Sequence, residues 1–161
     1  MKKVLIDTDV ILDFFFDREP FSDDAAKVLS LCESGEIKGF ITSVIISNVY
    51  YLLRQYATHE KVIEKLSQLI TITEVLTPDK NAILKALNSD FRDFEDALQN
   101  YSAELDGQID LIITRNIKDF KNSALGVMTP GNYLKTTIAS RKNQHHQITA
   151  TYIPCLQTID C

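Results

Sequence analysis

The chain has 161 residues and a net charge of −5, with 45% apolar and 24% charged residues. This length and composition predict one globular domain that buries its own core. The acidic balance excludes the global basic signature of a nucleic-acid binder. No apolar run reaches the ~18 residues of a membrane-spanning helix, and no secretory signal opens the chain. We therefore expect a cytoplasmic protein with no membrane partner.

Cysteine and charge patterns refine this expectation. Cys32, Cys155 and Cys161 are odd in number and match no zinc-binding spacing, which favours reduced thiols in a cytosolic protein. Cys32 falls on an apolar helical face, so we expect it in the core. Residues 115–142 carry six basic residues and one acidic residue. Such an asymmetry is typical of a phosphate-facing patch beside an acidic site, but also of a plain solvated surface.

The first predicted element is a strand that leads directly into acidic residues. Val4, Leu5 and Ile6 form a continuous apolar run, as in a strand buried on both faces of a parallel sheet, and Asp7 and Asp9 follow. Ligands of open α/β sheets bind at the carboxyl ends of the strands. The two carboxylates can hold a metal there or simply cap the next helix. This stretch alone leaves both interpretations open.

The rest of the chain alternates helices with short strands. The predicted helices cover about residues 11–16, 23–34, 43–56, 60–70, 77–88 and 93–105. The predicted strands cover residues 37–42, 72–76, 111–113 and 125–128, and Thr129-Pro130-Gly131 is expected to close the last one. The alternation predicts an α/β fold with a parallel sheet between helices. We expect one domain over residues 1–137 and an appendage over 138–161, with an edge-strand pattern at 148–153.

The helix predicted near residue 93 has an amphipathic stripe. Its apolar residues recur at intervals of three and four, which predicts the buried face of the helix. The stripe consists of Phe91, Phe94, Leu98, Tyr101 and Leu105.

Three segments place carboxylates at strand ends or at a helix start. They are Asp7 with Asp9, residues 93–96, and residues 114–119 after the strand at 111–113. Converging carboxylates repel one another and are tolerated with bound cations, for which Mg²⁺ or Mn²⁺ is suited. Two such ions can activate water for phosphodiester hydrolysis. The spacing of Asp93 and Asp96 also fits a plain helix cap, and Lys118 and Asp119 also fit an ordinary surface.

The ordered set of motifs resembles the PIN-domain family across about residues 2–136. The segments that carry the resemblance are Leu5–Asp13, Ile41–Ser43, Asp93–Leu98, Ile112–Phe120 and Met128–Pro130. The resemblance implies a three-layer α/β sandwich around a central parallel sheet. It also implies a Mg²⁺- or Mn²⁺-dependent endoribonuclease that hydrolyses RNA with a metal-activated water, as in the toxins of bacterial toxin–antitoxin pairs. A small antitoxin and a second copy of the chain would then be its protein partners.

The resemblance assigns roles to individual positions. Asp7 matches the family's first metal-binding aspartate, Asp96 matches the one at the start of the late helix, and Asp119 is the carboxylate of the last acidic segment. These three are the expected catalytic residues and metal ligands. Asp9 and Asn116 complete the expected set of metal ligands.

Further residues are expected around the metal. The residues expected to support the site are Thr8, Asn48 and Thr114. The residues expected to hold the RNA backbone are Arg115, Lys118 and Lys121.

Position 48 departs from the family, which usually has a glutamate there. Asn48 and Asn116 are neutral oxygen ligands that do not offset cation charge, and Asp9 would compensate for part of this loss. The alternative function is therefore a catalytically weak or inactive PIN-like module that binds RNA or a protein. Asp7-Thr8-Asp9 also resembles the Asp-x-Asp of haloacid-dehalogenase-like phosphatases, but the later lysine and Asp-rich loop of that family are not found.

Overall fold

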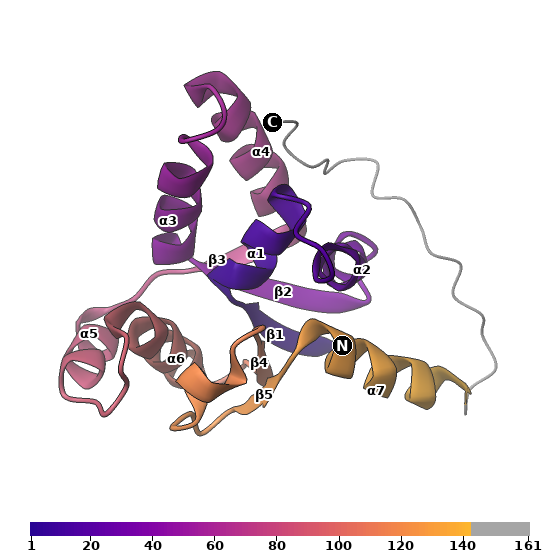
Figure 1. Cartoon of the computed structure of the whole chain (residues 1–161). Coiled ribbons are helices and arrows are strands. Elements are labelled where there is room, and N and C mark those ends of the chain that lie inside the picture. Colours follow the sequence, from indigo (N-terminus) through magenta and orange to yellow (C-terminus); the bar gives the residue numbers. More distant parts are fainter. Residues whose placement is uncertain (143–161) are drawn as a thin grey trace.

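The computed structural model describes residues 1–142, which form a five-stranded parallel sheet between two groups of helices (Figure 1). The strand order is β3-β2-β1-β4-β5. The strands are β1 (Lys2–Ile6), β2 (Ile37–Thr42), β3 (Thr73–Leu76), β4 (Leu111–Ile113) and β5 (Gly126–Met128). The helices are α1 (Thr8–Phe15), α2 (Ser22–Glu33), α3 (Ser43–Leu53), α4 (His59–Ile72), α5 (Lys80–Leu87), α6 (Phe94–Asp106), the 3₁₀ helix η1 (Ile117–Phe120) and α7 (Pro130–Lys142). The predicted α/β class and parallel sheet are confirmed.

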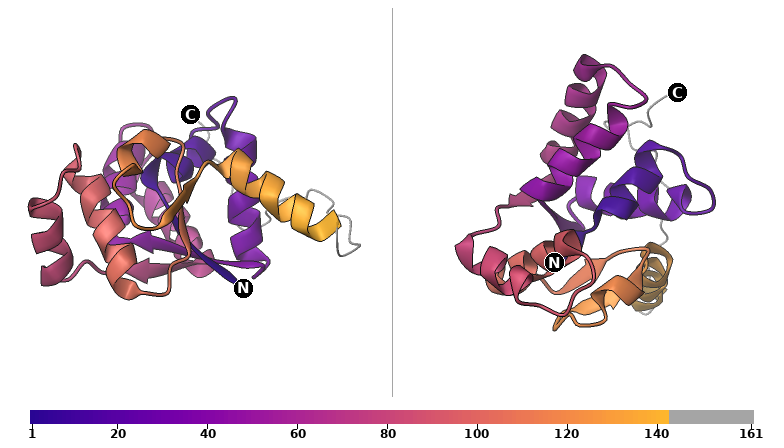
Figure 2. Two further views of the ribbon diagram at one scale, coloured as in Figure 1. Left: turned by 90° about the horizontal axis from the view of Figure 1, so that it is seen from below. Right: turned by 60° about the vertical axis from the view of Figure 1, so that its left-hand side comes forward.

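Strand β1 lies at the centre of the sheet because its continuous apolar run can be buried on both faces. Val4 and Ile6 pack with residues of α1–α4, whereas Leu5 packs on the other side with Ala103 of α6. The two helical layers are visible on opposite sides of the sheet (Figure 2). The prediction of a doubly buried first strand is therefore confirmed.

The pairing of β1 fixes the position of its carboxyl end. β1 pairs with β2 on one side and with β4 on the other, and Ile6 is in register with Ile113. The chain proceeds from β1 through β2 to β3 at one edge, then crosses to β4 and β5 at the other. The boundary between β1 and β4 is therefore a topological switch point, where α/β folds bind their ligands. Asp7 and Thr114 are the next residues on these two strands.

Two helix starts differ from the expectation. Thr129-Pro130-Gly131 begins α7 instead of a turn, because proline suits the first helical position and Thr129 Oγ1 accepts a hydrogen bond from the Asn132 amide at 3.2 Å. The helix predicted to start at residue 77 begins at Lys80, since Asp79 provides the cap by accepting from Ala82 N at 2.8 Å. Both starts follow a side chain that satisfies a free backbone amide.

The appendage predicted from residue 138 begins inside α7, which runs to Lys142. The remainder of the appendage, including the edge strand predicted at 148–153, lies outside the described residues. Within residues 1–142, no helix combines the length and the apolar character needed to cross a membrane.

Cys32 is a buried free thiol, as predicted, and it packs against β2 at Gly39. A Cβ atom on Gly39 would lie 2.6 Å from the Cys32 sulfur and 3.1 Å from Ile6 Cδ1. Both distances are shorter than van der Waals contact. The absence of a side chain at position 39 therefore allows α2 to pack closely on the sheet.

We predict that Gly39→Ala lowers the free energy of unfolding by about 1–3 kcal/mol, because the new methyl group overpacks the core. Gly126→Ala is the matched control, since its Cβ would meet Leu111 Cβ at an ordinary 3.5 Å. The control should change stability by less than about 0.5 kcal/mol. Urea denaturation of both variants measures the difference, and equal stabilities would contradict the packing argument.

Candidate functional site

Asp7 lies where β1 ends and is held by hydrogen bonds from three directions. Its backbone amide donates to Ile113 O at 3.0 Å, which ties it to β4. Its Oδ1 accepts from the Thr8 amide at 2.7 Å, and its Oδ2 accepts from the Thr114 hydroxyl at 2.8 Å. Asp7 is therefore the N-cap of α1, which confirms the helix-capping interpretation. Its second oxygen faces Thr114 across the switch point.

Asp9 is anchored through only one of its two oxygens. Oδ2 accepts from the Thr114 hydroxyl at 3.3 Å and from the Arg115 amide at 3.0 Å. Oδ1 is buried and has no hydrogen-bond partner among the described residues. A buried carboxylate oxygen without a partner is costly, so a cation or another donor at this point would relieve the cost.

Helix α6 brings the second carboxylate segment to the same edge. Asp93 is its N-cap, and its Oδ1 accepts from the amides of Glu95 at 2.8 Å and Asp96 at 3.2 Å. The capping interpretation of Asp93 is thus confirmed. The Asp96 side chain takes no part in this cap.

The third segment is ordered by Thr114 and Asp119. The Thr114 hydroxyl also accepts a hydrogen bond from the Asn116 amide at 3.0 Å. The side-chain amide of Asn116 donates to the Asp119 carboxylate on η1. These contacts join the last predicted segment to the residues that hold Asp7 and Asp9. We refer to Asp7, Asp9, Asp96 and Asp119 as the acidic cluster.

Burial and mutual repulsion make ionisation of the acidic cluster costly. Burial, followed by the charges of Asp9 and Asp96, raises the pKa of Asp7 to about 8, against hydrogen bonds from Thr114 and Thr8. Burial, followed by the charges of Asp93, Asp119, Glu95 and Asp9, raises the pKa of Asp96 to about 7. Burial also raises the pKa of Asp9, although Arg115 and Thr114 oppose it. A cation would stabilise the ionised forms.

The donor chemistry of the acidic cluster fits a hard divalent cation. Carboxylate and amide oxygens are the ligands that Mg²⁺ and Mn²⁺ prefer, and Asp9 Oδ1 is buried with no hydrogen-bond partner in the described part of the chain. Within residues 1–142, however, no three Asp, Glu, His or Cys side chains converge closely enough to hold an ion as they stand. The oxygens would have to draw together around the cation.

Arg115 connects the acidic cluster to a buried carboxylate that the sequence did not single out. Its Nη1 donates at 3.1 Å to Asp13 Oδ1, and Asp13 is only 1% exposed. Arg18 lies 3.8 Å from the same oxygen, and the Arg115 guanidinium stacks on Phe21. Asp9 and Asp13 are four residues apart on α1, so they share one helix face. That spacing was the available signal for Asp13.

Glu95 is another residue that sequence reasoning passed over, although its neighbour Asp96 was selected. The Thr8 hydroxyl donates to Glu95 Oε1 at 3.0 Å, and Gln99 Nε2 donates to the same oxygen at 3.3 Å. Gln99 is buried, whereas Phe94 and Leu105 of the predicted apolar stripe are 49% and 43% exposed. The predicted inward face of α6 was therefore wrong at Phe94 and Leu105, because the helix also turns polar residues such as Gln99 inward.

The remaining predicted residues lie at the margin of the acidic cluster. Asn48 is half-buried in α3, and no hydrogen bond within residues 1–142 links it to the acidic cluster. Lys118 and Lys121 are exposed beside Asp119. The structure thus joins Thr8 and Thr114 to the predicted aspartates, but gives Asn48 no such contact.

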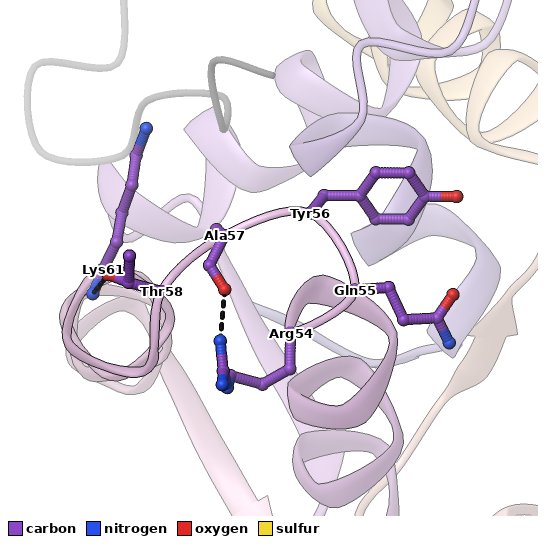
Figure 3. Close-up of a pocket in the computed structure, with 6 residues that line it drawn as sticks. All are labelled: Arg54, Gln55, Tyr56, Ala57, Thr58 and Lys61. Atoms are coloured by element: carbon purple, nitrogen blue, oxygen red, sulfur yellow. Dashed lines mark hydrogen bonds between the residues drawn. The ribbon is translucent and has the colours of Figure 1, made fainter.

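A separate hollow lies in the connection between α3 and α4 (Figure 3). Its volume is about 430 Å³, and the Arg54 side chain crosses it to donate to Ala57 O. The lining residues are Arg54, Gln55, Tyr56, Ala57, Thr58 and Lys61. None of the predicted site residues lines it, so we place the candidate site at the acidic cluster.

Comparisons with known proteins bear on the family and the fold. A family model described as a PIN domain matches residues 3–118. A search of the curated proteins found no match. A toxin–antitoxin complex from Klebsiella pneumoniae has a similar structure, with a TM-score of 0.59 and 23% identity over 79% of this chain and 97% of that chain.

Two further solved structures have the same fold at lower identity. DNA-bound VapBC from Salmonella typhimurium gives a TM-score of 0.59 and 17% identity over 81% of this chain and 99% of that chain. VapC20 of Mycobacterium tuberculosis, a toxin that cleaves the sarcin–ricin loop, gives a TM-score of 0.53 and 16% identity over 68% of this chain and 86% of that chain.

We predict that the metal-free protein becomes less stable as the pH rises from about 4 to about 8. Asp7 has a folded-state pKa of about 8 against 3.8 for an ordinary aspartate, so the folded state holds a proton that the unfolded state releases. Asp7→Asn removes this cost and should raise the free energy of unfolding near pH 8 by about 1–3 kcal/mol. Urea denaturation of wild type and Asp7→Asn in EDTA at pH 5 and pH 8 measures the pH dependence of stability and the effect of the substitution. A pH slope unchanged by the substitution would contradict the assignment.

We predict that Asp13→Asn lowers the free energy of unfolding by about 1–3 kcal/mol, because it removes the charged acceptor of Arg115. Asp23→Asn is the control, since Asp23 is exposed in the first turn of α2 and should change stability by less than about 0.5 kcal/mol. The two variants are compared by thermal and urea denaturation. Equal stability would show that the Arg115–Asp13 pair contributes nothing.

Proposed function

This chain belongs to the PIN-domain family, and from that premise we propose that it is a Mg²⁺- or Mn²⁺-dependent endoribonuclease acting in the cytoplasm. The observation that carries the proposal is the pair Asp7 and Asp9, held together at the switch point by the Thr114 hydroxyl. The unpartnered Asp9 Oδ1 supports a cation at this point. Asp96 lies within electrostatic reach of both aspartates.

The proposed roles follow from these contacts. Asp7, Asp96 and Asp119 are the carboxylates that bind the cation, and Asp9 Oδ1 and the Asn116 amide oxygen complete the set. The Thr114 hydroxyl holds Asp7 and Asp9 in place, and the Thr8 amide at the start of α1 donates a hydrogen bond to Asp7. When bound, the cation supplies activation of water and stabilisation of the leaving oxygen.

The proposed RNA contacts lie beside Asp119. Lys118 and Lys121 are exposed, and their ammonium groups can approach the phosphates of a strand that crosses the acidic cluster. Arg115 is partly committed, because its guanidinium is ion-paired to Asp13. We propose that Lys118 and Lys121 provide the main phosphate contacts and that Arg115 contributes a smaller share.

The proposed biological context is a toxin that is held by a small antitoxin. The support is the fold shared with the toxin–antitoxin complexes described above, and with a toxin whose own target is the sarcin–ricin loop. We propose a small antitoxin and a second copy of the chain as partners.

A second candidate function is a PIN-like module without catalysis that binds RNA or a protein. Asn48 favours it, because a neutral amide stands on α3 and no hydrogen bond within residues 1–142 joins it to the acidic cluster. Under this alternative, RNA binding persists without cleavage, and Asn48→Glu creates activity that the natural chain lacks.

We predict that the wild-type protein cleaves single-stranded RNA with millimolar Mn²⁺, and that EDTA abolishes the cleavage. Asp7→Asn and Asp96→Asn should each reduce the rate at least about 100-fold, because each removes a charged oxygen from the cation. Asp23→Asn should keep the wild-type rate. Gel analysis of a labelled RNA measures all four proteins. Equal cleavage by wild type and Asp7→Asn would contradict the proposed function.

A further inference from the structure

We propose that Glu95 supplies a further carboxylate to the divalent cation of the acidic cluster, positioned there by Thr8 and Gln99. The inference rests on the proposed function and adds a residue that neither the sequence motifs nor the comparisons assign. It starts from Thr8, which stands between Asp7 and Asp9 in the chain. The Thr8 hydroxyl donates to Glu95 Oε1 at 3.0 Å and so joins the first turns of α1 and α6.

Glu95 is held from its own helix as well. Gln99 lies four residues further along α6, on the same face, and its Nε2 donates to Glu95 Oε1 at 3.3 Å. Gln99 is 1% exposed, and its own Oε1 has no hydrogen-bond partner among the described residues. The buried Gln99 amide is thus oriented by its hydrogen bond to Glu95.

The two hydrogen bonds leave one carboxylate oxygen of Glu95 for a ligand. Both bonds end on Oε1, so Oε2 carries neither of them. Asp9 is similar in that its donors lie on Oδ2, whereas its buried Oδ1 has no hydrogen-bond partner within residues 1–142. In both residues one oxygen fixes the side chain and the other carries none of these hydrogen bonds. This is the arrangement expected of a preorganised cation ligand.

The charge of Glu95 also matters for the acidic cluster. Asn48 and Asn116 contribute no charge, so the set Asp7, Asp9, Asp96 and Asp119 carries all of the proposed compensation for the cation. Glu95 adds a fifth negative charge beside Asp96, which already experiences its field. A ligand set with more charge binds a divalent cation more tightly.

Titration calorimetry with Mn²⁺ alone tests the proposal on the full chain. Glu95→Gln keeps the size of the side chain and an oxygen that accepts from Thr8, so it removes the charge with little change in shape. Its Mn²⁺ affinity should fall at least about tenfold relative to wild type. Gln99→Leu removes the hydrogen bond to Glu95 but keeps the Glu95 carboxylate, so it should lower the Mn²⁺ affinity by a smaller factor. Glu64→Gln, an exposed acid on α4, is the control and should bind as wild type.

Melting temperatures in EDTA separate a cation ligand from a structural contact. If Glu95 is a cation ligand, Glu95→Gln melts at the wild-type temperature or higher without metal. Its melting temperature then rises less than that of wild type when Mn²⁺ is added. A purely structural role predicts a lower metal-free melting temperature and the same gain with Mn²⁺, and would overturn the proposal. Equal Mn²⁺ affinity of Glu95→Gln and wild type would overturn it as well.

The RNA cleavage assay distinguishes this inference from the proposed function. If wild type binds Mn²⁺, loses that binding in Glu95→Gln and cleaves no RNA, then Glu95 is a ligand and the ribonuclease proposal fails. If wild type cleaves RNA and Glu95→Gln binds Mn²⁺ and cleaves equally well, then the ribonuclease proposal stands and Glu95 is not a ligand. Absence of Mn²⁺ binding by wild type would overturn both.

Discussion

The repulsion among the carboxylates gathered at the carboxyl end of β1 is the constraint on which the rest of the site depends. Asp7 and Asp9 are brought together by a strand end and a helix turn, and the charge of each makes ionisation of the other harder. The fold offsets part of this cost. α1 and α6 both begin at the acidic cluster, and the partial positive charge of a helix N-terminus favours anions there.

Hydrogen bonds from Thr114 and Arg115 offset a further part of the repulsion between the carboxylates. They also differ between Asp7 and Asp9. The Thr114 hydroxyl has one proton and two carboxylate neighbours, at 2.8 Å and 3.3 Å, so it donates mainly to Asp7. Asp9 instead accepts a hydrogen bond from the Arg115 backbone amide, and the Arg115 guanidinium donates to the buried Asp13. The Arg115–Asp13 ion pair is therefore linked to the acidic cluster through the backbone of residue 115.

Local patterns in the sequence predicted the strands, most helices and the meeting of Asp7 with the Thr114 segment, because each depends on a strand end or a cap. They did not predict the Arg115–Asp13 pair, which joins residues 102 positions apart through a side-chain direction. The inward face of α6 was misread because its buried polar side chains donate to acceptors within the helix itself. Ser102 donates to Leu98 O, and Asn100 donates to Glu104, which lowers the cost of burying them. α7 was missed because Pro130-Gly131 also fits a turn.

The central position of β1 has a consequence for the order in which the molecule assembles. During synthesis, β1 can pair with β2 as soon as residue 42 is available, but its other edge stays open until β4 is made. Thr114 lies 107 residues after Asp7, so the two sides of the site meet only after most of the domain has left the ribosome. A fragment that stops before residue 111 would expose an unpaired edge of β1 and would lack Thr114 and Asp119. Late closure of the sheet thus delays the complete site until the chain is nearly whole.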